Sequence, residues 1–100
     1  MTCNTLPRVR LCFPLGQILA TPGALALLEG SNVSPMDLIA RHVVGDWGAV
    51  CAEDARANIE ALATGSRLLS CYFIHSNAEK VWLITEADRS ATTILLPDEY

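Results

Sequence analysis

The sequence predicts an α+β domain in which three short helices pack on a C-terminal three-stranded antiparallel meander. Helix start and stop signals occupy the first two thirds of the chain, whereas apolar and polar residues alternate through much of 67–100. An order of helices followed by strands is typical of α+β domains. The 100 residues contain no repeat and no linker, so we expect a single domain over residues 1–100.

Local signals place each of the three helices. Thr21-Pro22 and Ser34-Pro35 each combine a hydroxyl that can cap the first amides with a proline that suits the first turn. The third helix is expected over residues 52–64, with two carboxylates in its first turn, where the helix dipole favours them. The glycines expected to follow the last turns are Gly30, Gly45 and Gly65.

The strands are expected at Leu68–Ile74, Val81–Thr85 and Ala91–Leu96. These segments are rich in β-branched and aromatic residues, which suit a pleated and half-buried surface. Pro97 ends the last strand. The earlier segment Arg8–Phe13 also alternates, and it is a candidate extra strand at an edge of the sheet.

Composition and charge narrow the classes of function. The chain is 51% hydrophobic and carries a net charge of −4, with seven Lys and Arg scattered among eleven Asp and Glu. Nucleic-acid binding needs a basic stripe that displaces counterions, so we do not expect it. No apolar run of membrane length and no signal peptide appear, which predicts a cytoplasmic protein without a membrane partner.

The four cysteines are Cys3, Cys12, Cys51 and Cys71. None are spaced Cys-x-x-Cys, and no histidine stands at ligand spacing from any of them. We therefore expect free thiols in a reducing compartment, no metal site and no cofactor.

One candidate catalytic group lies near the end of the second helix, where His42 and Asp46 are four residues apart. If the helix extends to Asp46, the carboxylate can orient the imidazole as a general base. A toxin-like ribonuclease or other small hydrolase would add Arg41 or Arg89 to stabilise phosphate, and Asp46 or Glu86 as the orienting acid. The alternative is a histidine favoured by the helix dipole and an aspartate that caps the next turn. No nucleophile or oxyanion-hole pattern accompanies the pair, which favours this alternative.

A second group of residues indicates protein binding. Trp47 stands in a loop, where an indole can anchor a partner or fill a gap in the core. The last hairpin turn carries Glu86, Asp88 and Arg89, and a hydroxyl-rich strand with Thr92 follows it. Such a turn can bind a protein, a metal or a phosphate, or it is simply solvated, and a protein contact is the main functional alternative. With no catalytic set and an acidic balance, a non-enzymatic protein-binding module is the leading hypothesis.

The last strand also suggests an oligomer. If it lies at an edge of the sheet, its backbone can pair with a second copy, so a homodimer through Thr92–Leu96 is a further expectation.

Several strings of residues resemble a family of small bacterial proteins usually labelled plasmid-related or hypothetical proteins of integrative and conjugative elements. These strings are residues 41–48, Glu53-Asp54 with Asn58, residues 85–93 and residues 95–100. The resemblance spans about residues 15–100. It implies no activity, only a genetic setting: an accessory protein of a mobile element. One concrete version is an inhibitor of host defence such as restriction or CRISPR machinery.

Overall fold

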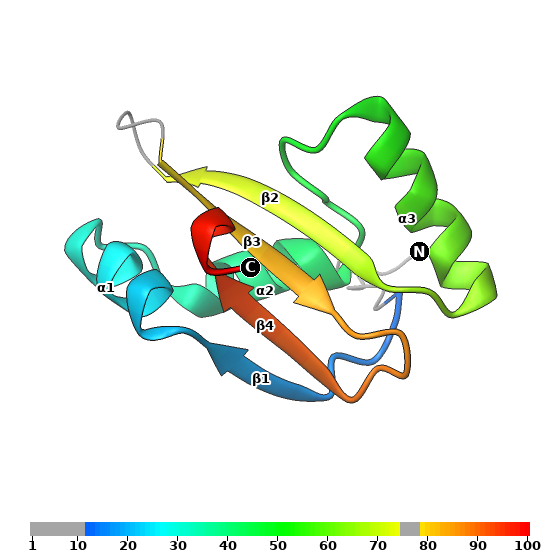
Figure 1. The fold of residues 1–100 in the computed structure, drawn as a ribbon, viewed down its shortest axis with the longest axis horizontal. Coiled ribbons are helices and arrows are strands. Elements are labelled where there is room, and N and C mark those ends of the chain that lie inside the picture. The colour runs from blue at the N-terminus through cyan, green and yellow to red at the C-terminus, as the bar shows by residue number, and fades with distance from the viewer. Residues whose placement is uncertain (1–11, 75–78) are drawn as a thin grey trace, which may run out of the picture.

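The computed structural model describes residues 12–74 and 79–100 (Figure 1). Its elements, in chain order, are β1 Gln17–Ala20, α1 Pro22–Gly30, α2 Pro35–Val43, α3 Ala52–Thr64, β2 Leu68–Ile74, β3 Glu79–Thr85, β4 Ala91–Leu95 and the 3₁₀ helix η2 Pro97–Glu99. The expected α+β class with three helices is confirmed.

Over residues 12–74 and 79–100, the sheet has four strands and is mixed, so it differs from the expected three-stranded meander. Its order is β1-β4-β3-β2. The last three strands pair antiparallel, as expected, while β1 pairs parallel to β4 with Gln17 opposite Ala91. The additional edge strand is therefore Gln17–Ala20. Most of the segment Arg8–Phe13, where we expected it, lies outside the described residues, and Cys12 and Phe13 are not in a strand.

The position of the last strand also corrects an expectation. β4 lies between β1 and β3, so both of its edges are already paired. Edge pairing of a second copy through Thr92–Leu96 would first have to displace one of these neighbours. Among the strands that the structure describes, the outer ones are β1 and β2.

The helices begin where the capping residues predict. Thr21 Oγ1 accepts a hydrogen bond from the Ala24 amide at 3.2 Å, and Ser34 Oγ accepts one from the Met36 amide at 3.3 Å. Prolines occupy the first turns of both helices, where no intrahelical donor is needed. Helix α3 ends at Gly65, whose φ of 79° is the left-handed conformation that glycine adopts readily.

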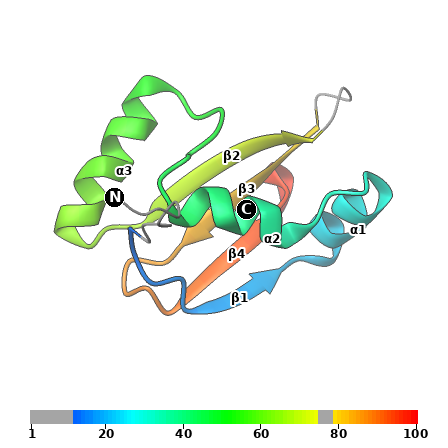
Figure 2. The same cartoon turned by 180° about the vertical axis from the view of Figure 1, so that it is seen from behind.

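Helix α2 lies across one face of the sheet, α1 follows at the end of β1 and packs into the same core, and α3 lies beside β2 (Figure 2). The main core fills the space between α1, α2 and the sheet; its buried members are Ala24, Leu28, Leu38, Ile39, Tyr72, Ile74, Val81, Leu83 and Ile94. A second cluster joins α3 to the start of β2 through Phe13, Trp47, Ala61 and Leu68.

The outer side of β2 is covered by parts of the chain that are not strands. Asn58 of α3, which is 3% exposed, uses its side-chain amide as a strand would. Its Nδ2 donates to the Leu69 carbonyl oxygen at 2.7 Å, and its Oδ1 accepts from the Leu69 amide at 3.0 Å. Two residues further along, Cys71 exchanges backbone hydrogen bonds with Trp47 and Ala49 at 3.0 and 2.7 Å. This edge is therefore protected against pairing with another chain.

We expect Asn58→Ala to lower the free energy of unfolding by about 2 kcal/mol, because it leaves a backbone N–H and C=O of β2 without their partner. Urea denaturation at neutral pH measures this change. Glu60→Ala, at an exposed position of the same helix, is the control and should change stability by less than about 0.5 kcal/mol. Equal effects of the two substitutions would contradict this role of Asn58.

Candidate functional site

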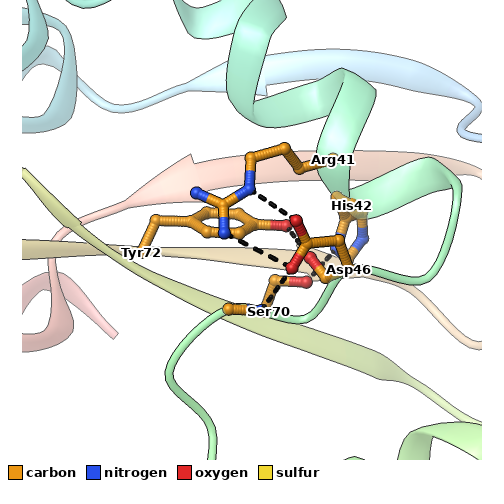
Figure 3. A network of polar contacts seen from close by, with 6 residues as sticks. Arg41, His42, Asp46, Ser70 and Tyr72 are labelled. Atoms are coloured by element: carbon orange, nitrogen blue, oxygen red, sulfur yellow. Dashed lines mark hydrogen bonds and ion pairs between the residues drawn. The ribbon is translucent and has the colours of Figure 1, made fainter.

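The candidate site forms where the end of α2 meets β2. Helix α2 ends at Val43, and Gly45 follows with a φ of 89°, which turns the chain back on itself. The Asp46 amide then donates to the Arg41 carbonyl oxygen at 2.9 Å. This local turn places the side chains of Arg41 and Asp46 side by side, with the Arg41 guanidinium over the ring of Tyr72 (Figure 3).

Arg41 and Asp46 form a bidentate ion pair. Arg41 Nε lies 2.7 Å from Asp46 Oδ2, and its Nη2 lies 3.3 Å from Oδ1. The guanidinium also stacks on Tyr72, with its carbon 4.4 Å from the ring centroid. The hydrogen bond from Arg41 lowers the pKa of the Asp46 carboxyl below its usual range. Both side chains are 48% exposed, so the pair adds little to stability but keeps both groups charged and oriented.

Tyr72 contacts both members of this pair. Its hydroxyl donates to the Asp46 backbone carbonyl at 2.5 Å, which fixes the loop after α2 to β2 (Figure 3). Burial raises the pKa of Tyr72 to about 12, so this phenol remains a donor at neutral pH. Gly48 passes so close to β2 that a Cβ there would overlap the Cys71 carbonyl oxygen and the Tyr72 ring.

A shallow cleft of about 340 Å³ opens beside the ion pair. Its lining residues are Arg41, Asp46, Gly48, Ala49, Cys71, Tyr72 and Phe73, and we call it the Arg41–Phe73 cleft. Phe73 is 56% exposed although it is a large apolar side chain in a strand. The cleft thus combines a stacked arginine with an exposed aromatic ring.

His42 does not belong to this cleft. Its side chain is 0% exposed and lies between α2 and the sheet. Its Nδ1 lies 2.5 Å from Ser70 Oγ on β2, and its Nε2 lies 2.9 Å from Thr85 Oγ1 on β3. The expected contact between His42 and Asp46 is absent, because α2 ends before Asp46 and the four-residue helical spacing no longer applies.

The hydrogen bonds around His42 fix its tautomer. Thr92 Oγ1 donates its one proton to the Leu15 carbonyl oxygen at 2.8 Å, so it must accept from Thr85 Oγ1 at 2.7 Å. Thr85 has then used its proton and must accept from His42 Nε2–H. His42 Nδ1 is left as the acceptor for the hydroxyl of Ser70. These bonds, which we call the His42 chain, run from β2 through α2, β3 and β4 to Leu15.

Burial lowers the pKa of His42 to about 4. The imidazole is therefore neutral at physiological pH, and both of its nitrogens are occupied by protein hydroxyls. A general base must reach a proton on its substrate, and in this structure the ring of His42 is enclosed by the protein.

The residues predicted to bind a partner fall into different environments. Trp47 is 7% exposed and packs against Phe13 and His42, with ring centroids 6.3 and 5.8 Å apart. Thr92 is 0% exposed and belongs to the His42 chain. The structure therefore places both in the core, which fits the alternative reading of Trp47 as a residue that fills a gap.

Arg89 of the last hairpin holds α3 to the sheet. Its guanidinium donates to the carbonyl oxygens of Ala61, Ser66 and Glu86 at 3.1, 2.7 and 3.1 Å. Asp88 is exposed and accepts from the Ser90 amide at 3.0 Å, as an ordinary turn aspartate does.

The structure does not gather the predicted charged residues into one cleft. Glu86 borders a separate pocket of about 250 Å³, lined also by Arg67, Ile84, Thr93, Leu95 and Tyr100. Arg41 and Asp46 are brought together at the cleft. His42 lies in the core, Arg89 contacts the end of α3, and Glu86 borders the separate pocket. Sequence reasoning did not suggest Tyr72 and Phe73 of the cleft, or Ser70 and Thr85 as partners of His42. Ser70 and Thr85 do leave a signal, since each is a hydroxyl at an inward position of an otherwise apolar strand.

Comparison with known proteins gives no match: no family model matches the chain, and neither does any curated protein or solved structure. In the described ranges 12–74 and 79–100, no helix has the length and apolar character needed to cross a bilayer. In the same ranges, no three His, Cys, Asp or Glu side chains are grouped so that they could hold a metal ion.

Lowering the pH should destabilise the protein through His42. Its folded pKa of about 4 is below the unfolded value of 6.5, so the unfolded state takes up the proton first as the pH falls. The stabilisation is complete above pH 6.5 and is lost progressively down to pH 4, a change of about 3 kcal/mol. Urea denaturation across this range measures it.

The matched variants are His42→Gln and His75→Gln, which remove the two histidines of the chain in turn. The pH dependence between 6.5 and 4 should shrink in the first and persist in the second. An unchanged slope in His42→Gln would contradict the assignment.

Proposed function

We propose that this chain is a non-enzymatic module that acts by binding another protein, and that the Arg41–Phe73 cleft is its contact surface. The observation that carries the proposal is the exposure of Phe73 next to the Arg41–Asp46 pair. Phe73 leaves 56% of its surface in water at the rim of a cleft of about 340 Å³. Aromatic and arginine side chains are enriched at the centre of protein interfaces.

The ion pair suits recognition more than chemistry. Two of the five N–H donors of Arg41 hold Asp46, and the stacking on Tyr72 limits the rotation of the guanidinium. A partner that covers the cleft would meet an arginine that is already ordered, so less conformational entropy is lost on binding. If an apolar side chain of the partner packed on Phe73, burial of that apolar surface would contribute favourable free energy of binding.

The burial of His42 weighs against the alternative of a toxin-like ribonuclease or other small hydrolase. A catalytic base has to touch its substrate, yet His42 is 0% exposed and its nitrogens are bonded to Ser70 and Thr85. The charge of −4 also repels RNA.

The resemblance to plasmid-related proteins supports one setting for this activity. We propose a cytoplasmic accessory protein of a bacterial mobile element, with a component of host defence as the protein bound. This part of the proposal rests on the resemblance and not on the geometry of the cleft.

Affinity capture from a bacterial host lysate tests the contact surface. Phe73→Thr should reduce recovery of the partner about tenfold, because it removes a central aromatic contact. Ile59→Thr is the matched control, since Ile59 is 59% exposed on α3 and does not line the cleft. It should recover the same partner as the unmodified chain. Equal recovery by both variants, or no reproducible partner for the unmodified chain, would overturn the proposal.

Incubation of the purified chain with bacterial RNA tests the alternative. We expect no cleavage above that of a mock purification. Cleavage that follows the folded protein and disappears in Asp46→Asn would instead favour the ribonuclease. Asp46 is the better residue to change, because substitution of buried His42 can also unfold the protein.

A further inference from the structure

Among the described strands, β1 is the outer one on the side opposite β2 (Figure 1). No backbone hydrogen bond joins its outward N–H and C=O groups to the described residues. The Gln17 amide donates to the Ser90 carbonyl oxygen at 2.9 Å, and the Thr21 amide donates to the Ile94 carbonyl oxygen at 3.0 Å. Backbone groups alternate in direction along a strand, so those of Ile18 and Ala20 point away from β4. They form a template for one more strand.

The two outer edges of the sheet are treated differently. On β2, the Asn58 amide covers Leu69 and the segment 47–49 covers Cys71. β1 is short, but its four residues contain no charge and no proline, which are two of the usual protections of an edge strand. Its side chains are also unusually exposed for apolar residues, with Ile18 at 42% and Leu19 at 41%.

We propose that a second copy of this chain pairs with β1, strand to strand and antiparallel. A two-fold axis at Leu19 sets Leu19 of one copy directly opposite Leu19 of the other. Ile18 of each copy then faces Ala20 of the other, and each such pair exchanges two backbone hydrogen bonds. The two four-stranded sheets become one continuous sheet.

The occupant is a second copy because the edge is complementary to itself. The outward donors and acceptors of Ile18 and Ala20 match under the two-fold rotation, as an isologous interface requires. Residues 16–20 are uncharged, so this acidic chain can approach its own copy there without placing like charges opposite each other. Pro22 has no amide hydrogen and limits the pairing to this short segment.

This dimer does not depend on the proposed function. The Arg41–Phe73 cleft lies at β2, at the other edge of the sheet, so it stays open when β1 is paired. A dimer would present two such clefts to its partners.

Sedimentation velocity of the full chain tests the proposal over concentrations up to about 1 mM, since small interfaces give weak dimers. The mass should rise from 10.8 kDa toward twice that value. Leu19→Lys and Leu19→Glu should each weaken dimerisation at least about tenfold, because like charges then stand directly opposite. An equimolar mixture of the two variants should regain association, since opposite charges then meet across the axis.

Circular dichroism confirms that each variant is folded before it is measured, and Leu19→Val serves as the neutral control that keeps the dimer. A chain that remains monomeric over the whole concentration range would overturn the proposal. So would a dimer that persists unchanged in both charged variants, or a mixture of them that fails to associate.

Discussion

The His42 chain is the interaction on which the rest of the structure depends. It is a continuous line of side-chain hydrogen bonds that begins at Ser70 and ends at the Leu15 carbonyl, buried between the helices and the sheet. Each member has one proton to give, so the direction of every bond is determined. Because α2, β2, β3 and β4 all contribute to it, loss of one member leaves a buried polar group unsatisfied in a neighbouring element. The His42 chain therefore ties α2 and the three strands to one another through polar contacts inside a mainly apolar core.

Local structure could be predicted from the sequence because its signals are local. Thr21 and Ser34 cap helices as expected, and the antiparallel strands are joined by short connections, so each pairing follows from neighbouring residues. β1 could not be predicted in this way. Its four residues show no alternation, and its parallel partner lies near the other end of the chain. Only the folded sheet supplies the reason for Gln17–Ala20 to be extended.

The site was predictable in part. The sequence marked Arg41 and Asp46 as candidates but paired Asp46 with His42, whereas in the structure Gly45 turns the chain after α2 and Asp46 contacts Arg41. The direction of His42 did not follow, because adjacent residues of a helix point to different sides and the sequence does not say which side faces the sheet. His42 points to the hydroxyls of β2 and β3, whereas Arg41 points to solvent and the cleft. His42 is therefore part of the core, and its neighbour Arg41 is part of the surface.

The parallel pairing of β1 with β4 has a consequence for synthesis on the ribosome. β1 leaves the exit tunnel before the other described strands, but its neighbour β4 consists of residues 91–95. During translation, the helices can form and β2 can pair with β3. Until β4 is available, the backbone groups of β1 and of the β3 edge that will pair with β4 remain exposed. The nascent chain is thus vulnerable to aggregation until its last strand emerges and inserts between them.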